Sequence, residues 1–398
     1  MNTRNNSTII NTTIVLILIM ISTPLSGLGI DLYSPSLPAI SKYFSVSHSH
    51  VKFTITAFII GFAIGQPFFG TFSDAKGRRL ATLIGLSIFT LASIIASLAI
   101  NIYLLISMRL LQGLAVSATS AVSKAIINDC FSGDALHRAS VYRVSSWVCA
   151  PIIAPMIGGY LQHFFGWRSN FYFFSGYGFI CLLATLFFLK ETNNHQIPFN
   201  FTTTLKNYQR IITHKKFFIG CIIIGFNYGL IVLFNLFGPF IIIDVLHHSS
   251  ITFGHTAFII ASALLLGTLS NRILIKKFNR EHILKMGITG MFTVSVTFYA
   301  LGHFIPMNLY TITIPIFIII VFMGWTQATL MIECLSIFPN QAGIAAASQG
   351  LIGMLLASIM STLAGCVHVV SLAGLALTYV FVTTMMFFLF LFFNKSDA

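Results

Sequence analysis

The chain of 398 residues is 56% hydrophobic and only 8% charged, with a mean hydropathy of +0.90. This composition excludes a soluble globular protein and indicates a polytopic membrane protein. The formal net charge is +13. In a membrane protein, such an excess comes from the loop Lys and Arg residues that set orientation, so we do not expect a nucleic-acid partner. Six cysteines are scattered without metal-site spacing, so no metal is expected.

Twelve long apolar runs follow one another along the chain, and each predicts a membrane-spanning helix. The residues do not alternate as they would in a β-barrel, so the expected fold class is an all-α integral membrane protein. The first span is expected over about 9–40, bent by the prolines and glycines between residues 24 and 38. The others are expected near 51–70, 80–100, 103–127, 139–162, 170–189, 217–243, 253–273, 283–304, 310–332, 342–364 and 371–393.

A polar segment divides these spans six and six. We expect an N-terminal six-helix bundle over 1–189, a cytoplasmic linker over 190–216 and a C-terminal six-helix bundle over 217–398. The two parts also repeat each other in sequence. AFII precedes GTFSD at 57–74, and AFII precedes GTLSN at 257–271, which favours a duplicated bundle.

The basic residues predict how the chain lies in the membrane. Of the 22 Lys and Arg residues, Lys42, Lys52 and Arg168 fall in expected outside loops and Arg109 falls within a span, which leaves 18 on the inner side. Lys and Arg are enriched on the cytoplasmic side of membrane proteins. The pattern therefore predicts that both termini are cytoplasmic.

Two charged residues within predicted spans are candidates for chemistry. Asp31 lies late in the first span, and intramembrane carboxylates tend to mark ion or proton pathways. The alternative is a helix-end carboxylate in the headgroup region. Arg109 lies in the fourth span, with Gln112 on the same helix face. The alternative there is a structural Arg bound to backbone carbonyls. We expect Asp31 to mark a proton pathway.

A short charged stretch separates the second and third spans. Asp74 and three basic residues, among them Arg78 and Arg79, follow one another closely and must lie in water. The stretch therefore predicts a tight cytoplasmic turn, in which Gly70 and Gly77 permit close approach and unusual dihedral angles.

The fifth span contains APIIAPMIGGYL at 150–161. Pro151 and Pro155 remove backbone donors, while Gly158 and Gly159 make the helix thin. A bent, thin helix packs closely and can pivot against a neighbour. The alternative is a purely structural kink.

These motifs resemble those of the major facilitator superfamily. GTFSDAKGRR is similar to its signature between spans 2 and 3, RLLQG at 109–113 to its span-4 signature, and the span-5 run to its antiporter signature. Ala154 replaces the Gly of the general antiporter pattern, as in the Bcr/CflA drug-resistance branch. IDLYSPSLPAIS, IINDCF, GWRSNF and FPNQAGIAAA resemble the same branch.

The resemblance implies the major facilitator fold, two pseudo-symmetric six-helix bundles around a central cavity. It implies a conformational latch in which Asp74 and Arg78 pair with Asp129, and which stabilises the outward-facing state. It also implies a bacterial inner membrane protein and a role for Arg109 in coupling protonation to substrate movement.

We therefore expect a proton-coupled exporter of small lipophilic compounds or drugs by alternating access, and not an enzyme. The expected partners are the substrate, protons and membrane lipid. The chain is expected to act as a monomer, without a cofactor beyond the proton motive force. The alternatives are an exporter of an endogenous metabolite such as a siderophore, a nutrient uptake permease and a non-transporting sensor. The residues expected to line the substrate cavity are Tyr33, Gln112, Asn227, Tyr228 and Asn235.

Overall fold

The computed structural model describes residues 11–193, 209–338, 342–367 and 369–395. Within these ranges the chain is built of helices without strands, and twelve helical segments are long and apolar enough to cross a membrane. This confirms the predicted all-α membrane fold with twelve spans. The first span comprises α1 (Thr12–Ser22), α2 (Pro24–Asp31), η1 (Ser34–Ser36) and α3 (Leu37–Phe44). The next five are α4 (His48–Lys76), α5 (Arg78–Ser97), α6 (Ile102–Cys130), α7 (Gly133–Phe165) and α8 (Arg168–Phe188).

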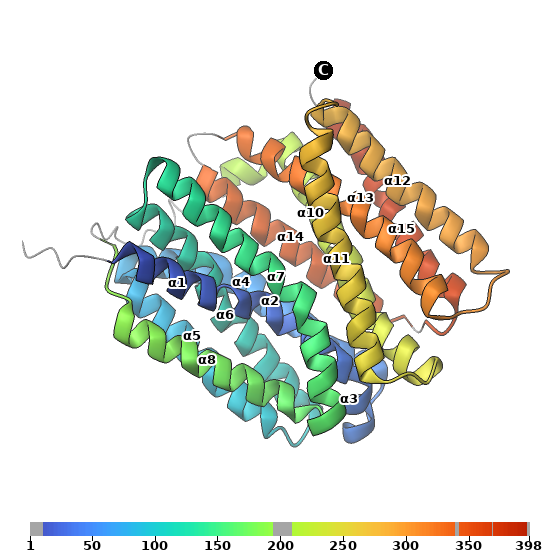
Figure 1. Cartoon of the computed structure of the whole chain (residues 1–398), viewed down its shortest axis with the longest axis horizontal. Helices are drawn as coiled ribbons and strands as arrows, with labels where there is room; N and C mark the ends of the chain where they lie inside the picture. The colour runs from blue at the N-terminus through green and yellow to red at the C-terminus, as the bar shows by residue number, and fades with distance from the viewer. Residues whose placement is uncertain (1–10, 194–208, 339–341, 368, 396–398) are drawn as a thin grey trace, which may run out of the picture.

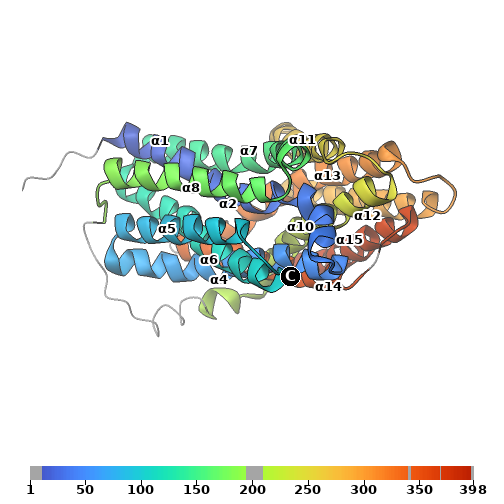
Figure 2. The same ribbon diagram turned by 90° about the horizontal axis from the view of Figure 1, so that it is seen from below.

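The seventh span comprises α10 (Lys215–Pro239) and the π-helical η2 (Phe240–Val245). The last five are α11 (Ser250–Leu274), α12 (Arg280–Leu301), α13 (Leu309–Ser336), α14 (Ala342–Gly365) and α15 (Leu372–Lys395). Figures 1 and 2 show the first six spans, in blue to green, beside the last six, in yellow to red. The linker residues 194–208 lie outside the described residues, so the domain limits stay a prediction.

The predicted spans differ from the observed helices mainly at their ends. The largest differences arise because helices continue beyond the apolar run into charged residues, which water can solvate. α4 reaches Lys76 rather than residue 70, so the predicted end of the second span is wrong, whereas the predicted tight turn is present. It consists of Gly77 alone, whose φ of 101° is open to glycine but strained for other residues.

The first span bends as expected. Helix α1 ends at Ser22, and Pro24 begins α2 because proline is tolerated in the first helical turn but not in a helix interior. A second break follows Asp31, where the Ser34 hydroxyl donates to the Asp31 carbonyl over 3.0 Å. These breaks place Asp31 at a helix end, well inside the span Thr12–Phe44.

The two ends of the molecule carry different contacts. We call the end where α4 ends and α5 begins the latch end, and the end where α4 begins and α7 ends the distal end. The first six spans meet the last six mainly through two helix pairs, α4 with α14 and α7 with α11. These pairs enclose the residues described next.

Candidate functional site

Asp31 is a buried carboxylate at the junction of the two halves. Asp31 is only 7% exposed, and one oxygen of its carboxylate accepts a hydrogen bond of 2.5 Å from the Asn235 amide on α10. Asn235 is itself 3% exposed. An ionised carboxylate in such a place is costly without partners, and Asn235 supplies one donor. The site thus joins the first span directly to the seventh.

Arg109 is fully buried within the first half. Its guanidinium donates to the Gly29 carbonyl over 2.5 Å and to the Gln112 amide oxygen over 3.1 Å. It also lies between two rings, 4.6 Å from the centroid of Tyr33 and 4.4 Å from that of Phe58. Arg fits this arrangement because its flat, delocalised cation can stack and hydrogen-bond at once.

The structure brings Arg109 to Gly29, two residues before Asp31 along the chain, without pairing the charges of Arg109 and Asp31. Asp31 is bonded to Asn235, whereas Arg109 binds the backbone of α2 at Gly29. Any influence of Arg109 on Asp31 therefore passes through the position of α2. The Nε atom of Arg109 is buried and has no hydrogen-bond partner among the described residues.

The other predicted cavity residues fall into two separate groups. Tyr33 is fully buried in the first half, and Gln112 is buried there too, donating to the Ser93 hydroxyl over 2.7 Å. Asn227 is buried in the second half, where its amide donates to the Thr326 hydroxyl over 3.2 Å. Tyr228, also on α10, is half-buried. Of these five residues, Asn235 is the one that is hydrogen-bonded to Asp31. That the five residues line a substrate cavity stays a prediction.

The structure brings the predicted latch residues together. The Arg78 guanidinium donates to the Asp129 carboxylate over 3.0 Å and to the Ser73 hydroxyl over 2.9 Å, and it is bonded to Asp74 near the end of α4. Because the Arg78 side chain is only 10% exposed, these bonds are more than loose surface pairs. They fasten α4, α5 and α6 together at the latch end. Arg79 lies beside them and donates to the Leu186 carbonyl over 2.9 Å.

Glu191 belongs to this cluster, and sequence reasoning missed it. Its carboxylate accepts from the backbone N–H of Arg78 over 2.8 Å and from that of Arg79 over 3.1 Å. A negative charge at a helix N-terminus satisfies free N–H groups and complements the helix dipole. A Cβ at Gly77 would overlap this carboxylate. The only sequence signal was a lone acid just after the sixth span.

Gly70 differs from Gly77. It lies inside α4, and an added Cβ would meet nothing within 4 Å, so the expected close approach is wrong in this structure. Gly70 shares a helix face with Lys52, about five turns away. On α14, Gly350 has equally open surroundings and shares a face with Ser361, about three turns away.

At the distal end, these same two faces are in contact. The Thr56 and Ser361 hydroxyls are hydrogen-bonded at 2.6 Å. Lys52 crosses from α4 to the end of α14, where its ammonium donates to the Val367 carbonyl over 3.2 Å and to the Ala364 carbonyl over 3.4 Å. Helices α4 and α14 therefore meet at the distal end, whereas Gly70 and Gly350, nearer the latch end, have open surroundings.

Lys52 corrects the predicted orientation pattern. It is not a loop residue but lies in α4, where it is 3% exposed and stands 4.2 Å from the centroid of the Phe237 ring. Carbonyls at a helix C-terminus and an aromatic face both stabilise a cation. Farther out, Lys42 pairs with Asp244 of η2 at 2.9 Å. The distal end is thus closed by contacts between the halves.

Helix α7 runs through both of its prolines and packs against backbone on two sides. A Cβ at Gly158 would overlap the Leu32 carbonyl of the first span. One at Gly159 would lie 2.5 Å from the Ser250 carbonyl of α11, in the other half. Pro151 lies against Gly27, and the Pro155 carbonyl lies against Gly254 of α11. The predicted close packing of this thin helix is therefore present.

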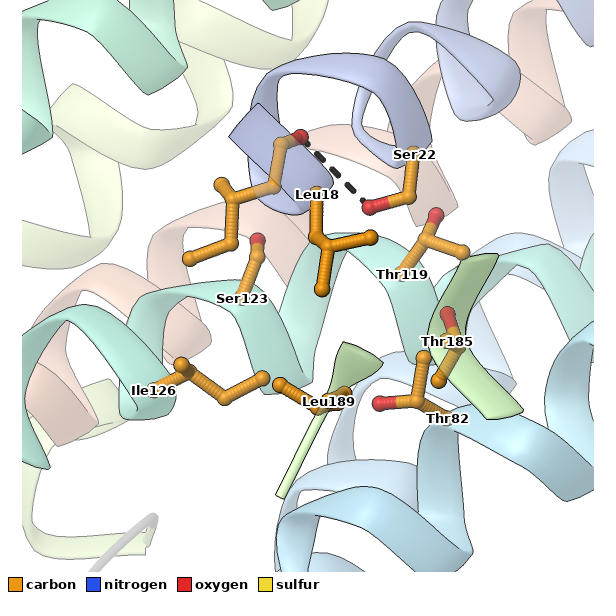
Figure 3. Close-up of a pocket in the computed structure, with 9 residues that line it drawn as sticks. Leu18, Ser22, Thr82, Thr119, Ser123, Ile126, Thr185 and Leu189 are labelled. Carbon is orange, nitrogen blue, oxygen red and sulfur yellow. Dashed lines mark hydrogen bonds between the residues drawn. The ribbon is translucent and has the colours of Figure 1, made fainter. Parts of the chain in front are cut away.

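A small pocket inside the first half is lined by both hydroxyl and apolar side chains (Figure 3). It lies between α1, α5, α6 and α8, and neither Asp31 nor Arg109 lines it. Most of its hydroxyls already donate to carbonyls of their own helices, as Thr119 does to Val116 over 2.8 Å. The pocket is therefore a packing feature of the first half. Its hydroxyl residues are Ser22, Thr82, Thr119, Ser123 and Thr185.

Two helical halves, closed together at one end over a buried carboxylate, define a membrane transporter of the alternating-access class. A sequence profile of the Major Facilitator Superfamily matches residues 19–365. The chain therefore belongs to the major facilitator superfamily, as its motifs predicted, and is a transporter rather than an enzyme.

Bacterial relatives agree with this assignment. The chain is 32% identical over 350 residues to the uncharacterized MFS-type transporter YdgK of Bacillus subtilis (strain 168), covering 86% of each chain. It is 27% identical over 304 residues to the bicyclomycin resistance protein homolog of Haemophilus influenzae, covering 75% of this chain and 76% of that one. The crystal structure of a D-xylose-proton symporter shares the fold, with a TM-score of 0.69, 15% identity and coverage of 94% and 97%.

Proposed function

We propose that this transporter is a proton-coupled exporter in which Asp31 carries the proton. The observation that supports this most directly is a carboxylate 7% exposed, well inside a membrane span and bonded across the two halves. Burial favours the uncharged form of such a group, while the Asn235 bond favours the ionised form. A carboxyl group with these opposed influences is suited to binding and releasing a proton during each cycle.

The proposed orientation places the latch end in the cytoplasm and the distal end outside. Lys76, Arg78, Arg79, Lys215 and Lys216 all lie at the latch end, and clustered Lys and Arg mark the cytoplasmic side. Since Lys52 is buried, the distal loops carry even fewer free basic groups than the sequence suggested. With bacterial relatives, this supports a place in the bacterial inner membrane with both termini in the cytoplasm.

In this orientation the halves touch at the outer end, where α4 and α14 are joined through Thr56 and Ser361. Nearer the cytoplasm, Gly70 and Gly350 of the same two helices have open surroundings. Export requires the reverse arrangement, with the latch end closed and the distal end open. The close packing of α7 on α2 and α11 provides a surface about which the halves rock.

The proposed substrates are small, lipophilic organic compounds. The bicyclomycin resistance protein homolog and the multidrug resistance protein MdtL of Salmonella are relatives, the latter 25% identical over 329 residues. The aromatic content of 14% suits an apolar substrate. We propose that the proton motive force supplies the energy and that the monomer is the working unit.

Proton movement in inside-out vesicles tests this proposal. A pH gradient is imposed, and dyes, antibiotics and siderophores are added one at a time to vesicles with wild type, Asp31→Asn or Asp134→Asn. Asp134 is an exposed carboxylate at the start of α7 and serves as the matched control. We expect at least one compound to dissipate the gradient with wild type and Asp134→Asn but not with Asp31→Asn. An equal response from Asp31→Asn would remove Asp31 from the proposal.

A further inference from the structure

Two half-buried cations of the first half take no part in the contacts described above. They are Lys124 of α6 and Arg143 of α7, and they are close enough to repel each other. Within the part of the chain that the structure describes, neither side chain has a hydrogen bond or an ion pair. Holding two like charges together without a counter-charge costs free energy. The pair is therefore suited to receive a negative charge from outside the chain.

The acidic residues of the chain are engaged or placed elsewhere. The chain has nine of them, and six have hydrogen-bond or ion-pair partners other than these two cations. Those six are Asp31, Asp74, Asp129, Glu191, Asp244 and Glu333. Asp134 is exposed at the start of α7, Glu281 lies in the first turn of α12 in the second half, and Asp397 lies outside the described residues.

Lys124 lies beside open space between the two halves. The Gln66 amide of α4 donates to the Ser120 hydroxyl of α6 over 3.4 Å. One helical turn farther toward the latch end, the same two helices carry Gly70 and Lys124. Gly70 is the α4 glycine with open surroundings, on the helix face that meets α14 at the distal end. Lys124 is therefore next to the side of the first half that faces the second half.

Arg143 approaches Lys124 from the other side of α1. Ile19 of α1 lines the small pocket together with Ser123 of α6, and the Ser146 hydroxyl of α7 donates to a carbonyl of α1. Lys124 follows Ser123 directly, and Arg143 precedes Ser146 by three residues. Helix α1 thus lies between the backbones that carry the two cations, and their side chains come together across it.

We propose that Lys124 and Arg143 bind a negatively charged group of the substrate, such as a carboxylate, phosphate or sulfonate on an otherwise lipophilic molecule. This inference rests on the proposed function, to which it adds a substrate class: lipophilic organic anions. Arg binds two oxygens of such a group at once, and Lys supplies a compact charge. In the proposed orientation the pair lies toward the cytoplasm, where an exporter takes up its substrate.

The electrostatic basis is the excess of one sign of charge. A cleft lined by cations between low-dielectric walls concentrates anions near it. A bound anion also removes the repulsion between Lys124 and Arg143, so part of its binding free energy comes from relief of that repulsion. A cationic substrate would add to the repulsion and is disfavoured by the same argument.

The alternative is that both residues only add to the positive charge of the cytoplasmic side. Arg138 of α7 and Lys215 of α10 provide matched controls, because they are an Arg and a Lys at the same end of the molecule and are both exposed. A general effect of positive charge predicts equal changes in anion binding for all four residues. A site predicts changes for Lys124 and Arg143 alone.

Three probes with one apolar body and different charge test the inference. They are naphthalene sulfonate, naphthalene sulfonamide and naphthylmethyl trimethylammonium, an anion, a neutral molecule and a cation. Equilibrium dialysis with the purified full chain in an uncharged detergent gives the Kd of each probe. The proteins are wild type, Lys124→Gln, Arg143→Gln, Arg138→Gln and Lys215→Gln, with Lys124→Arg as the variant that keeps the charge.

We expect wild type to bind the sulfonate at least about tenfold more tightly than the other two probes. Lys124→Gln and Arg143→Gln should each weaken sulfonate binding about tenfold and leave sulfonamide binding unchanged, because a charged partner is lost. Lys124→Arg, Arg138→Gln and Lys215→Gln should bind like wild type. No preference for the sulfonate in wild type, or an equal loss in the exposed controls, would overturn the inference.

Thermal unfolding separates a binding role from a structural one. Since each Gln variant removes a repulsion, its midpoint should equal or exceed that of wild type. A lower midpoint in both variants, together with weaker sulfonate binding, would assign the pair a structural role and overturn the inference.

A lipid headgroup is the other source of an anion at this site. The dialysis is therefore repeated with phosphatidylglycerol in the micelles, and the sulfonate is added to the inside-out vesicles described above. Displacement of the sulfonate by this lipid, without sulfonate-driven proton movement, would overturn the substrate assignment.

Binding in detergent requires no proton transfer, so the two proposals fail separately. A wild type that prefers no anion leaves the proposed function standing if another compound drives proton movement that Asp31→Asn abolishes. Tight sulfonate binding that phosphatidylglycerol does not displace, with equal proton movement in Asp31→Asn and wild type, keeps the anion site and defeats the proposed role of Asp31.

Discussion

The single-residue turn at Gly77 gives a sharp prediction, because a second glycine in the same motif serves as its control. Gly77 has φ 101° and ψ 152°, a region essentially reserved for glycine, and an added Cβ would overlap the Glu191 carboxylate. In Gly77→Ala the backbone strain costs about 1–3 kcal/mol. Displacing Glu191 from the start of α5 adds about 1 kcal/mol. The expected loss of stability is therefore about 2–4 kcal/mol.

Gly70→Ala should behave in the opposite way. Gly70 is helical and its surroundings are open, so alanine there meets no neighbour. Replacing glycine by alanine within a helix stabilises by about 0.5–1 kcal/mol. Both substitutions add one methyl group within the same motif. Their opposite expected effects on stability come from the different backbone conformations and surroundings of the two glycines.

Thermal unfolding in detergent measures both variants. A thiol-reactive fluorophore reports when the buried Cys181, Cys221 and Cys334 become exposed, in a background with Cys130, Cys149 and Cys366 replaced by Ser. We expect the midpoint to fall by several degrees in Gly77→Ala and to hold or rise in Gly70→Ala. Equal midpoints for Gly77→Ala and wild type, or a lower midpoint for Gly70→Ala than for Gly77→Ala, would refute the account of this turn.

Two further substitutions test contacts of the buried helices. Arg109→Lys keeps the charge but cannot both bond Gly29 and stack between Tyr33 and Phe58, so substrate-driven proton movement should fall at least about tenfold, with lower thermal stability. A rate of proton movement in Arg109→Lys equal to that of wild type would show that transport requires only the positive charge at this position. Gly159→Ala places a Cβ against α11 and should therefore raise the fraction of molecules whose distal end is open. This fraction is measured from the distance between spin labels at Ile100→Cys and Phe304→Cys, which are exposed distal residues of the two halves. An unchanged fraction would mean that α7 and α11 separate without effect on the distal end.

The span pattern was predictable because it depends on local composition. Twelve apolar runs gave twelve spans, and the prolines of the first span gave its bends. The association of Arg78 with Asp74 and Asp129 was predicted from the resemblance of GTFSDAKGRR and IINDCF to family motifs, and the structure shows these contacts. The end of α4 was not predictable from hydropathy, because a helix continues into charged residues wherever water can solvate them.

The missed contacts all join residues that are distant along the chain. Glu191 caps α5 from 113 positions away, and Asn235 reaches Asp31 over 204 positions. A single lysine near an expected loop reads as solvated, so Lys52 was placed outside; only the end of α14 shows why it is buried. Single-chain periodicity carries no information about such pairings.

The contacts that close the distal end also bear on how this transporter can change over time. Lys52 donates to the carbonyls of Ala364 and Val367, and the Ser250 hydroxyl donates to the carbonyl of Gly159. Main-chain carbonyls persist when the side chain that bears them is replaced. Mutations that alter the side chains of Ala364 or Val367 therefore leave the acceptors of Lys52 in place. The sequence at these positions can therefore change over time while the hydrogen bonds that close the distal end are retained.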